Sequence, residues 1–154
     1  MLTIRTLENI KRGASITFYN GIYAILFGIF YLVFFRFILK ENFRAITIVW
    51  QVFAKYNPAL NSLLVRLMVL KGLFIITIGI AIIYLSLYIL RKKDRATWII
   101  LFIIGLTFWP ILLTFEILDK NLYTTVLSSI GWITFIIGMI IPIRYYMQRN
   151  YTEY

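Results

Sequence analysis

The chain has 154 residues, of which 62% are hydrophobic and only 14% are charged, and its mean hydropathy is +0.87. Soluble domains are about half apolar and about a quarter charged, so this composition is typical of a protein that lies in a membrane. The chain contains no cysteine and no histidine. Disulfides, thiol chemistry, Cys- or His-ligated metals and haem, and catalysis by Cys or His are therefore excluded.

The net charge is +10, from sixteen basic and six acidic side chains. In a soluble protein this excess would suggest nucleic acid as a partner. Here the basic residues lie between apolar runs, so we expect them to contact anionic lipid head groups and to set the topology, with no nucleic-acid partner. The six acidic residues are not clustered as an oxygen-ligand metal site requires, and we expect no metal and no cofactor.

Four apolar stretches are long enough to cross a bilayer as helices, since a helix needs about 20 residues to span a hydrocarbon core of about 30 Å. They cover about residues 16–35, 63–90, 98–118 and 122–146. Strands of a barrel would alternate in polarity, and helices of a soluble bundle would carry polar faces, whereas Ile99 to Leu106 is apolar on every side. The sequence predicts an all-α integral membrane protein, a four-transmembrane-helix bundle that forms one domain over residues 1–154.

The flanking charges favour one orientation of these spans. Residues 1–15 are polar and basic, and the apolar run that follows is too long for the core of a signal peptide, so we expect it to remain as an anchor. With the N-terminus inside, nine Lys and Arg residues lie on the inner side and seven on the outer side. The dense basic turn from Arg91 to Arg95 adds to this bias. We expect both the N- and C-termini to be cytoplasmic.

The connection between the first and second spans has a helical pattern of its own. Phe43, Ile46, Trp50 and Phe53 recur at helical spacing, and charged side chains fall near the opposite face. The pattern predicts an interfacial amphipathic helix over about residues 41–56, ended by the Asn-Pro pair at 57–58. This helix would anchor or cap the bundle, or would instead dock a partner or gate access to the interior.

Three spans carry glycines seven residues apart, which places each pair on one helix face. Such faces let helix backbones approach closely in a membrane. We interpret them as packing seams, with a substrate passage along the glycine faces as the alternative. The third span differs because a proline near its middle, Pro110, predicts a kink. The glycine pairs are Gly21 and Gly28, Gly72 and Gly79, and Gly131 and Gly138.

No acidic or basic residue lies near the centre of a span, and the charges gather at the membrane edges instead. The predicted topology brings five of them to the outer edge: Arg36, Arg66, Lys71, Glu116 and Asp119. Glu116 is the only carboxylate inside an apolar run. An unpaired charge at that depth costs several kcal/mol, so we expect Glu116 to pair with Lys71 or Arg66, unless each side chain reaches water separately.

These observations favour a non-enzymatic membrane protein that is an accessory or structural subunit of a larger assembly, or a homo-oligomer packed through the glycine faces. Its expected partners are membrane lipids and other membrane subunits or copies of itself. The alternative is a channel or transporter for a small solute or lipid-like molecule, with a polar path lined by Asn20, Thr107 and Thr114. An enzyme acting on lipid head groups would have to rely on Glu116 with a neighbouring Tyr or Lys.

Overall fold

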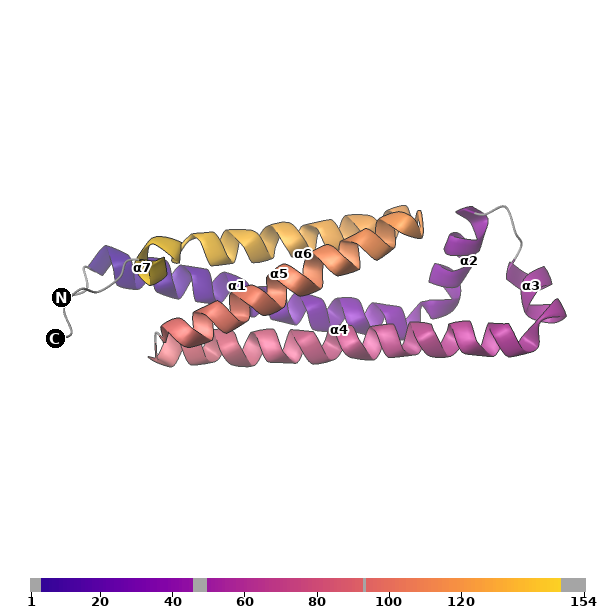
Figure 1. Cartoon of the computed structure of the whole chain (residues 1–154), viewed down its shortest axis with the longest axis horizontal. Helices are drawn as coiled ribbons and strands as arrows, with labels where there is room; N and C mark the ends of the chain where they lie inside the picture. The colour runs from indigo at the N-terminus through magenta and orange to yellow at the C-terminus, as the bar shows by residue number, and fades with distance from the viewer. Residues whose placement is uncertain (1–3, 46–49, 93, 148–154) are drawn as a thin grey trace.

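The computed structural model describes residues 4–45, 50–92 and 94–147. Every element in these ranges is a helix (Figure 1). In chain order they are α1 (Ile4–Val33), α2 (Phe35–Ala45), α3 (Trp50–Tyr56), α4 (Pro58–Lys92), α5 (Arg95–Leu118), α6 (Leu122–Ile140) and α7 (Ile143–Met147).

Four of the helices, α1, α4, α5 and α6, are long and apolar enough to cross a membrane. Two of them extend well beyond the predicted spans: α1 begins at Ile4 instead of about residue 16, and α4 begins at Pro58 instead of about residue 63. In α1 the helix continues past the apolar part of the chain. An ion pair between Glu8 and Arg12, one helical turn apart, supports this polar first part.

The last predicted span, about residues 122–146, is divided in the structure. The helix α6 ends at Ile140, a turn follows, and α7 begins at Ile143. The physical reason is Pro142, which has no backbone N–H and so cannot continue the hydrogen-bonding pattern of α6. The third span agrees more closely with its prediction, since α5 runs from Arg95 to Leu118 and continues through Pro110 as one helix. A kink at Pro110 stays a prediction.

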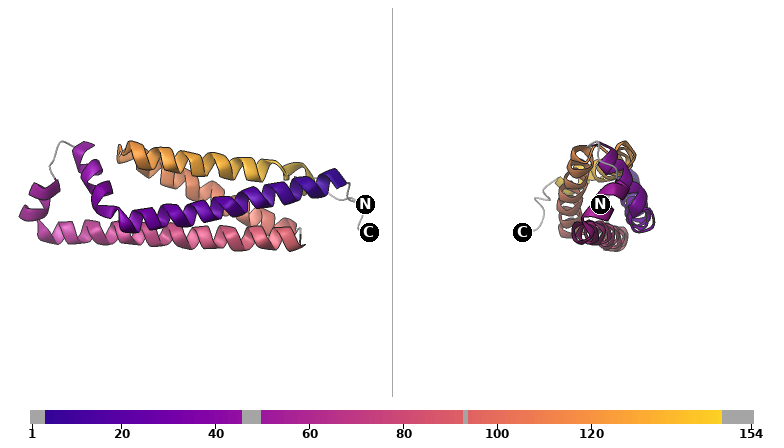
Figure 2. Two further views of the ribbon diagram at one scale, coloured as in Figure 1. Left: turned by 180° about the vertical axis from the view of Figure 1, so that it is seen from behind. Right: turned by 90° about the vertical axis from the view of Figure 1, so that its right-hand side faces the viewer.

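The four long helices lie side by side, and α5 crosses the others obliquely. The helix α1 packs against α4 and α6, and α5 packs against α4 and α6 in turn. Figure 1 shows α5 running from α4 at one end of the molecule toward α6 at the other, and Figure 2 shows the same arrangement from behind and from one end. We call the end at which α2 and α3 lie the α2 end; α1 begins and α7 lies at the opposite end.

Glycines bring the backbones of α1 and α4 together at two levels. A Cβ atom added to Gly28 would lie 2.7 Å from the carbonyl oxygen of Gly72, and one added to Gly21 would lie 2.9 Å from that of Gly79. No side chain larger than hydrogen fits there without moving the helices apart. Gly131 instead makes room for the ring of Trp109, whose nearest atom would be 2.1 Å from an added Cβ. Gly138 faces Thr17 of α1.

The connection after α1 forms two short helices, α2 and α3, where the sequence predicts a single helix over about residues 41–56. Residues 46–49, including Ile46 of the predicted apolar face, lie outside the described residues. The rings of Phe43, Trp50 and Phe53 are within 6.1 Å of one another, centroid to centroid. Asn57 then caps α4, because its side-chain oxygen accepts a hydrogen bond from the backbone N–H of Leu60 at 3.1 Å.

Candidate functional site

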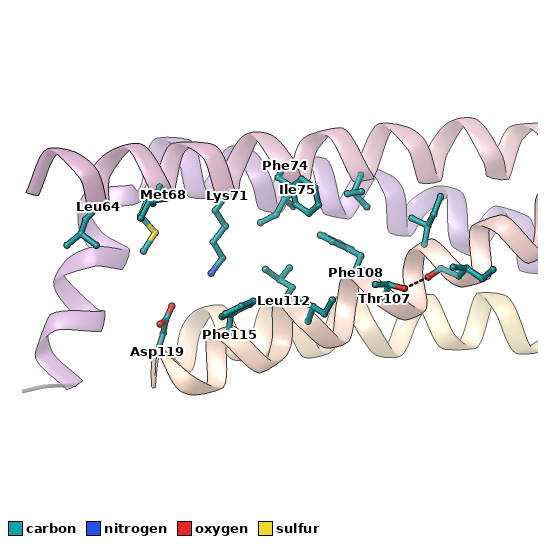
Figure 3. Close-up of a pocket in the computed structure, with 15 residues that line it drawn as sticks. Leu64, Met68, Lys71, Phe74, Ile75, Thr107, Phe108, Leu112, Phe115 and Asp119 are labelled. Carbon is teal, nitrogen blue, oxygen red and sulfur yellow. Dashed lines mark hydrogen bonds between the residues drawn. The ribbon is translucent and has the colours of Figure 1, made fainter. Parts of the chain in front are cut away.

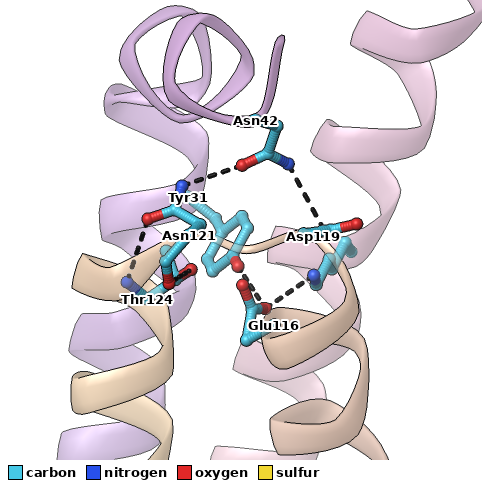
Figure 4. A network of polar contacts seen from close by, with 7 residues as sticks. Tyr31, Asn42, Glu116, Asp119, Asn121 and Thr124 are labelled. Carbon is cyan, nitrogen blue, oxygen red and sulfur yellow. Dashed lines mark hydrogen bonds and ion pairs between the residues drawn. The ribbon is translucent and has the colours of Figure 1, made fainter. Parts of the chain in front are cut away.

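The most concentrated polar chemistry in the described residues surrounds Glu116, near the α2 end of α5. Its side chain is fully buried. The Nζ atom of Lys71, on α4, lies 2.6 Å from Oε1 of Glu116, and the hydroxyl of Tyr31, on α1, donates a hydrogen bond to the same oxygen (Figure 4). Lys71 also lies 4.9 Å from the centroid of the Tyr31 ring, a cation–π distance. Three long helices are thereby joined at one carboxylate.

A second set of polar contacts lies beside this carboxylate and reaches α2. Asn42 of α2 donates a hydrogen bond to Oδ2 of Asp119 at 3.3 Å and accepts one from Asn121 at 2.8 Å (Figure 4). Asn121 is also the N-cap of α6, because its side-chain oxygen accepts a hydrogen bond from the backbone N–H of Thr124. The short helix α2 is thus fastened to the turn between α5 and α6.

The tight turn between α5 and α6 places Asp119 beside the ion pair. Lys120 adopts a positive φ of 52°, a left-handed conformation that reverses the chain within a few residues. Asp119 is half-buried, and burial raises the pKa of its carboxyl above the ordinary value. The nearby Lys71 opposes this rise of the pKa, and Glu116 adds to it.

The structure brings together three of the five residues of the predicted outer-edge cluster: Lys71, Glu116 and Asp119. The pairing of Lys71 with Glu116 is one of the two expected from the sequence. The other two residues of the predicted cluster, Arg66 and Arg36, lie apart from this ion pair. Arg66 is exposed, and the guanidinium of Arg36 lies 5.7 Å from the centroid of the Phe35 ring. Neither residue forms an ion pair with the described residues.

Sequence reasoning missed the uncharged members of this network, Tyr31, Asn42 and Asn121. Asn121 had a detectable signal, since an Asn directly before an apolar helical run is a common N-cap. Tyr31 and Asn42 had none, because their partners lie 85 and 77 residues away along the chain.

A second buried polar group lies between α1, α5 and α6. The side-chain nitrogen of Asn20 donates to the carbonyl oxygen of Gly131 at 2.7 Å and to the hydroxyl of Thr134 at 2.8 Å. Its oxygen accepts a hydrogen bond from the indole N–H of Trp109 at 3.2 Å. Thus three of the four hydrogen bonds that an amide side chain can make are used within the chain.

An apolar groove of about 810 Å³ lies between α4 and α5 (Figure 3). Aliphatic and aromatic side chains such as Phe74 and Phe108 form most of its wall, and Thr107 contributes a hydroxyl that donates to its own helix backbone. At the α2 end, Lys71 and Asp119 reach into the groove from opposite helices. The groove follows from the oblique path of α5, which diverges from α4 toward that end.

The network at Glu116 joins three helices through one carboxylate. Glu116 and Tyr31 are the groups that an acid–base reaction here would need, and both side chains are fully buried. The two groups at the network that face an open space are Lys71 and Asp119, at the mouth of the groove. Comparison with protein-family models, with curated proteins and with solved structures finds no match to this chain.

Proposed function

We propose that this chain is a non-enzymatic multi-pass membrane protein that acts as an accessory or structural subunit of a larger membrane assembly. One observation carries the proposal: three buried polar contacts join the four long helices to one another. Glu116 joins α5 to α1 and α4, and Asn20 joins α1 to α5 and α6. Ser86 of α4 donates to Thr17 of α1 at 2.9 Å. Polar side chains used in this way stabilise a fixed arrangement of helices.

In the proposed topology all four long helices cross the bilayer as one bundle, with both termini in the cytoplasm. The beginning of α1 and the basic turn at Arg91 and Lys92 are at the same end of the molecule, which agrees with an even number of crossings and with the positive-inside rule. The amphipathic helix α2 then lies in the opposite interface. Its apolar residues Ile38 and Leu39 are buried, and its basic residue Lys40 is exposed.

Contact with other subunits has to use a surface other than the glycine faces. All six glycines of the predicted seams are buried within the chain, where they face other helices of the same molecule. Large apolar side chains remain exposed on the outer surface, among them Leu70 of α4 and Leu106 of α5. A homo-oligomer packed through the glycine faces is therefore not supported, and we place subunit contacts on these outer apolar surfaces.

The alternative of a channel finds less support in the positions of its expected lining. Thr107 lies in the groove between α4 and α5 and Thr114 is exposed outside it, and each hydroxyl donates to a backbone carbonyl of its own helix at 2.8 Å. Asn20, the third expected lining residue, is buried and already bonded to Gly131, Thr134 and Trp109. These three residues do not form a shared path.

The test is to crosslink the tagged protein in its native membrane and to purify it in two unrelated mild detergents. The proposal expects the same foreign subunit at a fixed stoichiometry in both preparations. Substituting Leu70 or Leu106 by Asn should reduce that recovery, whereas Asn at an exposed polar position, Ser62→Asn, should not. A crosslinked product that contains only this chain, together with solute flux in vesicles made from the pure protein, would contradict the proposal and favour transport.

A further inference from the structure

The groove between α4 and α5 combines an apolar wall with two opposite charges. Its lining on α4 extends from Leu64 to Ile78, which corresponds to about 21 Å of helix at a rise of 1.5 Å per residue. Lys71 lies halfway along this length, and Asp119 lies across from it, directly after the end of α5 (Figure 3). On α4 the apolar wall therefore continues for about 10 Å beyond Lys71, as far as Ile78.

The size and lining of the groove suit a small amphiphile. Its volume of about 810 Å³ lies within the range of about 300 to 1,000 Å³ of small-molecule sites, which are mostly apolar with a few polar groups. An amphiphile with a slender apolar part and a polar end fits this description, and a partner helix is the outcome that the last experiment below distinguishes.

The charged side chains in the groove indicate which polar group a bound amphiphile would carry. The Lys71 ammonium has three donors, and its ion pair with Glu116 uses one of them. Asp119 has no ion-pair partner among the described residues, and the hydrogen bond it receives from Asn42 is long, at 3.3 Å. The mouth therefore offers N–H donors for an anionic oxygen on one side and a carboxylate for a cationic donor on the other.

The carboxylate of Asp119 opposes a purely anionic head group. Lys71 is already paired with Glu116, so the phosphate of a lipid with a net negative charge would place a further negative charge close to Asp119. A zwitterionic head group adds no net charge and supplies both a phosphate for Lys71 and an ammonium for Asp119. A primary ammonium can donate a hydrogen bond to the carboxylate, whereas a quaternary ammonium has no N–H.

We propose that the groove between α4 and α5 binds a zwitterionic phospholipid with a primary amine, with its acyl chain along Phe74 and Phe108 and its head group between Lys71 and Asp119. This site stands independently of the proposed role as a subunit, because its evidence is the shape and charge of the groove alone. Annular lipid, in contrast, would cover this surface without regard to the head group.

The test uses native mass spectrometry of the delipidated full chain in detergent. Synthetic phosphatidylethanolamine, phosphatidylcholine and phosphatidylglycerol with identical acyl chains are added in turn. We expect the first phosphatidylethanolamine to bind about tenfold more tightly than either of the others, the effect of one charge-assisted hydrogen bond. Equal binding of all three lipids, or a preference for phosphatidylglycerol, would overturn the proposal.

Two matched pairs of variants locate the site. Asp119→Asn should abolish the preference for the primary amine, whereas Glu41→Gln, which changes a carboxylate at the same end that is paired with Arg44, should leave it unchanged. Thr107→Trp places a large ring in the apolar part of the groove and should weaken the binding of all three lipids. Thr114→Trp, on the same helix but outside the lining, should not weaken it. Identical behaviour within either pair would contradict the assignment.

A last arm tests for a protein occupant in the native membrane. Because the chain has no cysteine, Thr107→Cys provides a single attachment point for a photoreactive maleimide directed into the groove. We expect adducts with phospholipid after illumination. Adducts with a foreign protein or with a second copy of this chain would show that the groove is a protein interface and would overturn the lipid assignment.

Discussion

The ion pair between Lys71 and Glu116 predicts an unequal response to removing its two members. Lys71→Met keeps an unbranched apolar side chain but leaves the carboxyl of Glu116 fully buried without its cation. Glu116→Gln keeps an oxygen that can accept the hydrogen bond from Tyr31. It leaves a lysine whose side chain is already 23% exposed and can turn toward the membrane surface.

The structure sets the order of the losses in unfolding free energy. Removing one partner of a buried pair costs about 3–5 kcal/mol when the other cannot reach solvent, which is the situation of Lys71→Met. Glu116→Gln should cost about 1–2 kcal/mol, since the remaining cation can be hydrated. The double variant contains no charge at this position and should be more stable than Lys71→Met alone. The coupling between the two sites should therefore be at least as large as the loss of Glu116→Gln, about 1–2 kcal/mol.

The assay is reversible unfolding of the purified protein in mild micelles by added SDS, followed by circular dichroism and tryptophan fluorescence. Arg66 provides the control, because this exposed cation has no ion pair with the described residues, and Arg66→Met should change stability little. If the losses of the two single variants simply add in the double variant, the pair does not hold the helices together as described.

Three further predictions follow from other parts of the fold. Gly28→Ala should destabilise the protein by about 1–3 kcal/mol in the same assay, because the added Cβ would lie 2.7 Å from a carbonyl oxygen of α4. Ala is the better helix former, so a gain of stability would show that the two helices do not approach closely at Gly28. Asn20→Leu should lower the free energy of unfolding by about 1–3 kcal/mol and shift the fluorescence emission of Trp109, because the indole N–H loses its hydrogen-bond acceptor. Unchanged emission would count against the contact between Asn20 and Trp109. Hydrogen bonds from the side chain and backbone of Thr97 hold the pKa of Asp94 below its ordinary value of 3.8, so this cap stabilises α5 above that pH and the contribution is lost as the pH falls through the lowered pKa. Asp94→Ala should therefore lower the melting temperature at neutral pH and remove this loss in acid, and a melting temperature equal to the wild type at pH 7 would refute the cap.

The four long helices could be predicted from the sequence because their signal is local. A run of some twenty apolar residues has few alternatives to a membrane-spanning helix, whatever lies elsewhere in the chain. The ends of the helices were less predictable, since hydropathy does not report where helical hydrogen bonding stops. The proline at 142 was visible in the sequence and would have placed the end of α6 better than the apolar run did.

The candidate site could be predicted only in its charged part. Glu116 stood out because a carboxylate in an apolar run requires a partner, and the topology offered two cations. Tyr31 and Asn42 could not be found in this way, because a Tyr in an apolar run and an Asn in a connection are both ordinary. The groove could not be predicted from the sequence either, since it depends on the oblique path of α5 between α4 and α6.

The proposal that the chain crosses the membrane four times, with both ends on one side, is tested most directly by cysteine labelling. The chain has no cysteine, so single cysteines at Glu8, Glu41, Asp94 and Lys120 can each be probed with a membrane-impermeant maleimide in intact cells. We predict that the cysteines at 41 and 120 react from outside, and that those at 8 and 94 react only after the cells are permeabilised. Labelling of positions 94 and 120 from the same side would contradict the four crossings.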